Sequence, residues 1–147
     1  MTKYFFTKRK LLNGLFGFRV VVRRRRVGVR IKSKKRKAEY LKYKDQAKIF
    51  VINKVAELNK NYGYKINRIT IRNQKTRWGS CSKKGNMNFN YKIVLLPEKL
   101  AEYIIVHEIC HLGEFNHSAN FWNLVAQTIP DYKEKRKELH KAGMRLR

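Results

Sequence analysis

Apolar residues between positions 39 and 61 recur with the spacing of one face of a helix. The positions that carry this pattern are Ala47, Phe50, Val51, Val55 and Leu58. The pattern stops at Tyr62-Gly63, where glycine favours the end of a helix. The sequence therefore predicts a helix over residues 39–61.

Polar and apolar residues alternate in two shorter segments that follow this helix. The first runs from Ile66 to Arg72 and predicts a strand with one apolar side. The second begins after Gly85 and continues into an apolar run that ends before Pro97, which predicts another strand. We expect residues 74–84, between the two, to form a loop.

The C-terminal part of the chain carries the start and stop signals of helices. Pro97 and Glu98 suit a first turn, because proline is tolerated there and a carboxylate favours the positive end of the helix dipole. A helix over residues 98–112 is therefore expected, with Gly113 as its left-handed C-cap. Further helices are expected over residues 119–128 and in the charged tail, residues 131–147.

The first third of the chain has a different pattern. Residues 4–31 carry Asn13-Gly14, which favours a hairpin turn, and many β-branched residues, namely Val20, Val21, Val22, Val27, Val29 and Ile31. Residues 32–37 are nearly all cationic, which favours a solvated linker or an anion-binding arm. The predicted organisation is a basic, β-rich arm over residues 1–38 and one folded domain over residues 39–147.

The charge of the chain is its abnormal property. There are 36 Lys and Arg against 10 Asp and Glu, which gives a formal net charge of +26. Residues 1–48 alone hold 18 basic and 2 acidic side chains. Because such a surface attracts polyanions, nucleic acid is a candidate partner, bound without sequence preference through the basic N-terminal segment.

Cysteine usage and hydropathy limit the class of protein. The two cysteines, Cys81 and Cys110, are not in a CxxC pair, so neither a disulfide framework nor a cysteine zinc knuckle is indicated. A reducing compartment, the cytoplasm, is therefore expected. Apolar runs stay well short of the ~20 residues that cross a membrane, so no membrane partner is expected.

A candidate metal site lies in the predicted helix 98–112, where the sequence reads His107-Glu108-Ile109-Cys110-His111. Histidines at i and i+4 lie one turn apart on the same face, so both imidazoles can bind one ion. This is the HExxH arrangement of zinc hydrolases, in which the glutamate acts on a water. His117 follows the expected helix break and is the predicted third ligand; Glu114 is the rival, if the helix continues.

Three neutral imidazoles would leave one position on zinc for a water. Zinc would acidify that water, and Glu108 would accept its proton as general base during peptide hydrolysis. Tyr132 and Arg77 are candidates for stabilising the oxyanion. A structural zinc site usually has four protein ligands rich in cysteine, so the open position favours catalysis.

Several segments together resemble the YgjP-like zinc metallopeptidases, relatives of the SprT-like and WLM proteases. The resemblance runs from about Glu39 to the C-terminus and rests on these motifs in order: Arg77-Trp78-Gly79-Ser80-Cys81-Ser82, Leu96-Pro97, residues 103–112, Asn116-His117-Ser118, Phe121-Trp122 and Pro130-Asp131-Tyr132. It implies an α+β, minimal zincin-like fold with a small antiparallel or mixed sheet packed on the active-site helix. It also implies that His107, His111 and His117 bind zinc and that Glu108 is catalytic.

Two alternatives to a simple peptidase stay open at this point. One is a basic nucleic-acid-binding protein in which zinc is only structural. The other combines both activities, because SprT-like relatives act on proteins bound to DNA. For Arg77 to Cys81 we expect a structural role, since glycine and serine suit a tight turn and Trp78 suits a core.

Overall fold

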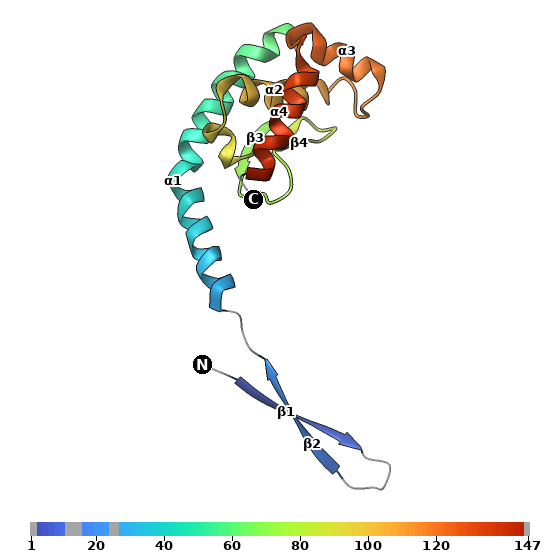
Figure 1. Cartoon of the computed structure of the whole chain (residues 1–147). Helices are drawn as coiled ribbons and strands as arrows, with labels where there is room; N and C mark the ends of the chain where they lie inside the picture. Colours follow the sequence, from blue (N-terminus) through green and yellow to red (C-terminus); the bar gives the residue numbers. More distant parts are fainter. Residues whose placement is uncertain (1–2, 11–15, 24–26, 146–147) are drawn as a thin grey trace. The chain divides into compact units, whose positions relative to one another are not determined.

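The computed structural model describes residues 3–10, 16–23 and 27–145. Contacts divide the chain into two compact units, Met1–Arg36 and Lys37–Arg147, which are described separately below. Figure 1 gives the order of the elements along the chain. None of the helices in the described residues is long and apolar enough to cross a membrane.

The first unit contains an antiparallel pair of strands, β1 (Lys3–Lys10) and β2 (Phe16–Arg23). Lys3 lies opposite Arg23, and Lys10 lies opposite Phe16. The predicted β structure is confirmed for these segments, whereas the predicted turn at Asn13-Gly14 lies outside the described residues.

Helix α1 spans Val27–Leu58 and corrects two predictions. Val27, Val29 and Ile31 were predicted as strand residues but lie in its first turns, and the cationic residues 32–37 are helical instead of a linker. Lysine and arginine are good helix formers, so a cationic run can form a solvated helix as readily as a linker. The predicted core face of this helix is confirmed, since Ala47, Val51 and Val55 are buried.

The second unit contains a three-stranded mixed sheet in the order β3-β5-β4. Strand β3 (Arg68–Arg72) is parallel to β5 (Asn86–Asn90), and β4 (Gly79–Cys81) is antiparallel to β5. Strands β3 and β5 were predicted. Strand β4 lies in the predicted loop 74–84 and was missed, because three residues are too few to show an alternation.

Two short 3-10 helices complete the connections. The first, η1 (Asn59–Asn61), ends α1 before Gly63, which has a φ of 68°. The second, η2 (Tyr91–Leu95), replaces the predicted continuation of the strand after residue 90. A buried apolar run suits a helix as well as a strand, so periodicity could not distinguish them.

Three helices follow, α2 (Glu98–Cys110), α3 (Ala119–Thr128) and α4 (Tyr132–Arg145). All three were predicted, but the left-handed C-cap at Gly113 was not correct, since Gly63 and Gly85 are the glycines with positive φ among the described residues. Gly113 is needed for packing instead: a Cβ there would collide with the Tyr64 hydroxyl.

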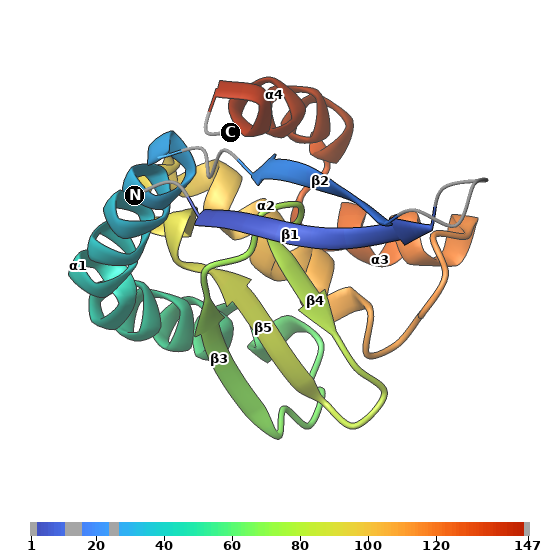
Figure 2. The ribbon, with the colours of Figure 1, turned by 90° about the horizontal axis from the view of Figure 1, so that it is seen from below.

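Helix α2 is the centre of the second unit, with strands β3, β4 and β5 packed against it (Figure 2). On one side Ile104, Ile105 and Ile109 join the core formed with α1 and the sheet. On the other side Tyr103, Val106 and Cys110 pack with residues of α3. Burial on two sides fixes the position of this helix, and with it the side chains of the candidate metal site.

Candidate metal centre

Helix α2 carries the first two candidate ligands. His107 lies in its last turn, and His111 is the residue that caps its C-terminus. The chain then turns at once, because the N–H groups of Gly113 and Glu114 both donate to the carbonyl of Cys110, at 3.1 and 2.9 Å. This turn sends the chain back past the helix end, so His117 reaches the site just before α3 begins.

The three histidines form a cluster whose candidate ligand atoms all lie within 4.8 Å of one another. The Nε2 atoms of His107 and His117 are 3.2 Å apart. Two nitrogens bound to one tetrahedral zinc at ~2.05 Å would be separated by roughly 3.3 Å. The spacing of His107 and His117 therefore fits a metal ion of this size, and His111 completes a donor set of three imidazoles.

The hydrogen bond of His111 fixes its tautomer. Its Nδ1 lies 3.1 Å from the carbonyl oxygen of Glu114, and because a carbonyl can only accept, Nδ1 donates. Nε2 of His111 then carries no proton and is free to bind a cation. A backbone carbonyl on the second nitrogen is the usual way to orient a metal-binding imidazole.

Burial keeps the imidazoles of His107 and His111 neutral. It is the main cause that lowers the pKa of His107 to about 3, and the charges of His111, His117 and Arg136 lower it further. Burial also lowers the pKa of His111. A neutral imidazole is the form that binds a metal, so the site does not need to lose protons from these two groups near pH 7.

Phe121 forms a common support for the three imidazoles. Its fully buried ring has centroid distances of 4.9, 4.6 and 4.8 Å to His107, His111 and His117. Trp122, the next residue of α3, stacks on His117 at 5.7 Å. The sequence offered Phe121 and Trp122 only as part of a family motif, so their contact with the site was not foreseen.

Glu108 is buried, with a relative exposure of 6%, and burial raises its pKa to about 8, while the charge of Arg77 opposes this rise. Its carboxylate lies against Gly79 of β4. A Cβ on Gly79 would stand 2.5 Å from Oε1 of Glu108 and 2.7 Å from its Cδ. Glycine is therefore required at this position to leave room for the carboxylate.

Asn90 holds the loop that leads into β4. Its side-chain amide donates to the carbonyls of Gln74 and Arg77, at 3.0 and 3.3 Å, and its Oδ1 accepts from the N–H of Lys92 at 3.2 Å. Trp78 packs against the main core from the same loop. The contact of Gly79 with Glu108 adds to the structural role expected for Arg77 to Cys81.

The remaining predicted residues lie around this centre. Among the described residues the cluster of candidate ligands holds the three histidines and not Glu114, which meets the site through its backbone carbonyl. Arg77 is exposed, and its charge acts on Glu108. Tyr132 stacks on Trp122 at 5.0 Å, one ring away from His117.

Residues 22–142 match the family model of the YgjP-like metallopeptidase domain. The chain belongs to the YgjP-like metallopeptidase family. The match begins within the predicted arm, so this YgjP-like domain takes in all of α1. A peptidase acts on proteins or peptides. Membership of a metallopeptidase family also implies a metal ion, which the three histidines could bind.

A solved structure supports the same fold for the YgjP-like chain. It is the metallopeptidase zymogen abylysin of Pyrococcus abyssi, which is 26% identical, with a TM-score of 0.58. The similarity covers 63% of this chain and 93% of abylysin. Comparison with curated proteins gave no match.

Proposed function

We propose that the chain is a zinc peptidase in which His107, His111 and His117 hold the metal and Glu108 is the general base. The observation that carries this proposal is the convergence of three imidazoles next to a buried carboxylate; their candidate ligand atoms lie within 4.8 Å of one another, and the Nε2 atoms of His107 and His117 are 3.2 Å apart. Imidazole suits zinc, whereas magnesium and calcium prefer oxygen ligands.

The chemistry divides between the metal and Glu108. Zinc held by the three histidines would act as a Lewis acid, which would acidify a water and polarise the scissile carbonyl. Glu108 takes a proton from the attacking water and passes it to the leaving amine. Its burial in an apolar setting keeps its proton affinity high enough for this exchange near neutral pH. Stabilisation of the oxyanion by Arg77 or Tyr132 stays a prediction.

The edge of the sheet supports a proposal for how a substrate binds. Strand β4 is at the edge of the sheet, and its Gly79 touches the Glu108 carboxylate. An extended peptide that pairs with this edge through backbone hydrogen bonds would run past the catalytic carboxylate. We expect substrates to be unfolded or flexible segments for this reason.

Metal analysis of the purified protein and its variants tests the ligand assignment. The parent should contain about one zinc, and His107→Ala, His111→Ala and His117→Ala should each lose it, since a three-histidine site cannot spare a ligand. Glu114→Ala is the control: it keeps the backbone carbonyl that orients His111 and should keep the metal. Zinc retained without His117 and lost in Glu114→Ala would reassign the third ligand.

A second function, binding of nucleic acid, is favoured by the composition of the first unit. Residues 1–36 hold 14 Lys and Arg and neither Asp nor Glu. We propose that this segment binds DNA or RNA without sequence preference. Affinity should fall steeply with salt, and removal of residues 1–36 should weaken it most. Unchanged affinity after that deletion would refute the proposal.

A further inference from the structure

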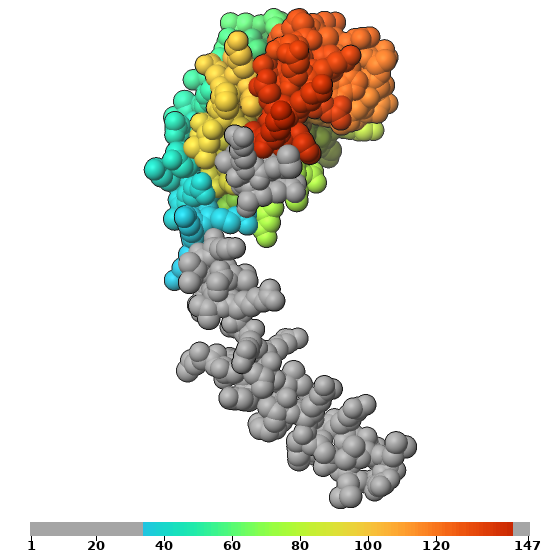
Figure 3. Space-filling model, in the orientation of Figure 1, coloured from blue at the N-terminus to red at the C-terminus, as the bar shows by residue number. Residues whose placement is uncertain are grey.

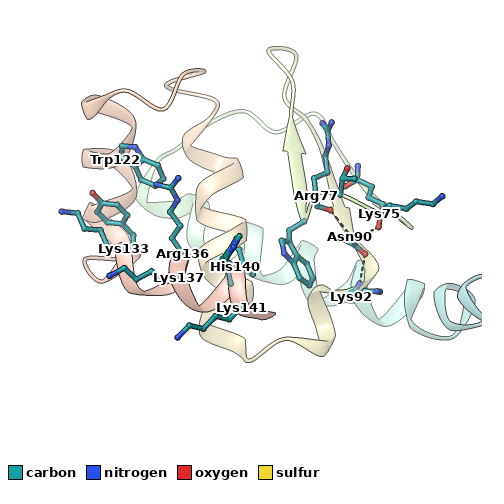
Figure 4. Close-up of a pocket in the computed structure, with 15 residues that line it drawn as sticks. Lys75, Arg77, Asn90, Lys92, Trp122, Lys133, Arg136, Lys137, His140 and Lys141 are labelled. Atoms are coloured by element: carbon teal, nitrogen blue, oxygen red, sulfur yellow. Dashed lines mark hydrogen bonds between the residues drawn. The ribbon is translucent and has the colours of Figure 1, made fainter. Parts of the chain in front are cut away.

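A pocket with a volume of about 1260 Å³ opens in the second unit, beside the candidate metal centre. One wall comes from the loop before β4 and the segment after β5, with Lys75, Arg77 and Lys92 (Figure 4). The other wall comes from α3 and α4. Both helices lie at the surface in the space-filling view (Figure 3).

The pocket has a one-sided charge. Of the fifteen lining residues in the part of the chain that the structure describes, seven are Lys or Arg and none is Asp or Glu. Lys133, Lys137 and Lys141 recur every four residues and so lie along one face of α4. The nearby carboxylates of Asp131 and Glu138 pair instead with Lys135, which does not line the pocket. Among the described residues, Lys133, Lys137 and Lys141 take part in no ion pair, so the positive charge of this face of α4 is left for an anionic ligand.

Ring and backbone contacts connect the pocket to the catalytic residues. Trp122 lines the pocket and stacks on His117. The Cζ atom of Arg136 lies 5.3 Å from the centre of the Trp122 ring. On the opposite wall, Arg77 lies two residues before Gly79, and Gly79 touches Glu108. A polypeptide that reaches the catalytic centre would thus place its neighbouring residues in this pocket.

The aromatic lining favours a peptide over a nucleic-acid strand. Single-stranded nucleic acid is held by bases stacked on free aromatic rings. The Trp122 ring is already stacked on Tyr132 and His117, with Arg136 over it. Trp78 packs against the core. The lysines of α4 that line the pocket, Lys133, Lys137 and Lys141, are the groups that remain for recognition.

We propose that this pocket is a specificity site that binds Asp and Glu side chains of the substrate, so that the enzyme prefers acidic segments next to the scissile bond. The inference rests on the proposed peptidase function. Peptide binding, measured separately from cleavage, tests it independently. Two or three exposed ion pairs should give a preference of about fivefold to tenfold over a neutral peptide.

The test uses a fluorescein-labelled, glutamate-rich flexible peptide and a twin with glutamine in place of every glutamate. Affinity is measured by anisotropy on full-length Glu108→Gln protein, which prevents cleavage, and kcat/KM is measured on the zinc-loaded parent. The variant Lys137→Gln/Lys141→Gln removes two charges of the pocket and keeps helix propensity. The control, Lys48→Gln/Lys99→Gln, removes two exposed charges that do not line the pocket.

The acidic-to-neutral ratio should fall towards one in Lys137→Gln/Lys141→Gln and stay near its parent value in the control. In Lys137→Glu/Lys141→Glu, with its fold checked by circular dichroism, the preference for the acidic peptide should fall further than in Lys137→Gln/Lys141→Gln, because two carboxylates now repel it. Equal losses in pocket and control variants would overturn the inference, because they indicate only general attraction to a basic protein. The pocket would instead be assigned to nucleic acid if single-stranded DNA displaces the acidic peptide and if the affinity for that DNA falls in the pocket variant but not in the control.

The two proposals fail in different ways. Selective, pocket-dependent binding without cleavage would refute the peptidase and keep the pocket. Cleavage at equal rates for both peptides would keep the peptidase and refute the specificity site.

Discussion

Gly79→Ala should perturb the Glu108 carboxylate, the proposed general base, without touching any candidate ligand. The added Cβ would stand 2.5 Å from Oε1 of Glu108, whereas ordinary contact begins near 3.4 Å. The carboxylate must therefore move by about 1 Å, and a misplacement of that size can reduce a rate by about 10²-fold. Zinc content should stay at the parent level, and overpacking should cost about 1–3 kcal/mol of stability.

The assay is kcat/KM on a flexible protein substrate with zinc in excess, beside metal analysis and urea unfolding. Ser80→Ala is the matched control, because the side chain of the next residue points to the other face of the strand. Adding Gly79→Ala to Glu108→Gln should lower the rate no further if the change acts through Glu108. Parent-like activity of Gly79→Ala, or a full further loss in the double variant, would refute the placement of Glu108.

Three further outcomes follow from other contacts. Asn90→Ala should lower the free energy of unfolding in urea by about 1–3 kcal/mol, because buried hydrogen bonds to the loop are broken. The control Asn86→Ala, on the same strand, should change it by no more than ~0.5 kcal/mol, and equal effects would contradict the role of Asn90. The charge of Arg77 lowers the pKa of Glu108, so Arg77→Gln should raise that pKa. The acidic limb of the pH profile of kcat/KM should then move to higher pH, and an unmoved limb would show that Arg77 does not act on Glu108. Burial raises the pKa of both Cys81 and Cys110 to about 11, so about 10⁻³ of each is thiolate at pH 8. Alkylation of the folded protein by iodoacetamide should therefore be at least ~100-fold slower than alkylation in urea. Equal rates would contradict the burial of these thiols.

Helical and alternating patterns predicted most elements of the second unit. The core face of α1 follows from apolar spacing, which burial in the structure confirms. The predicted bounds of α3, which stops before Pro130, are also confirmed. The start of α1 could not be predicted, because lysine and arginine suit both a solvated helix and a linker. Strand β4 was missed because pairing with β5, a long-range contact, creates it.

The candidate site was predicted as far as residue chemistry allows. Spacing of four placed His107 and His111 on one face, and the structure brings His117 beside them. The support from Phe121 and the close approach of Gly79 depend on the packing of α3 and β4 against α2. No local pattern encodes such contacts, and the only signal was the presence of both residues in motifs that resemble the family.

Glu108→Gln tests the central claim most directly, because it keeps the size and helix propensity of the side chain and removes the group that can take a proton. The variant should fold, hold as much zinc as the parent and bind nucleic acid equally well. Its rate of peptide hydrolysis should fall by at least ~10²-fold, the scale of a lost general base. A zinc-loaded variant that cleaves as fast as the parent would contradict the account.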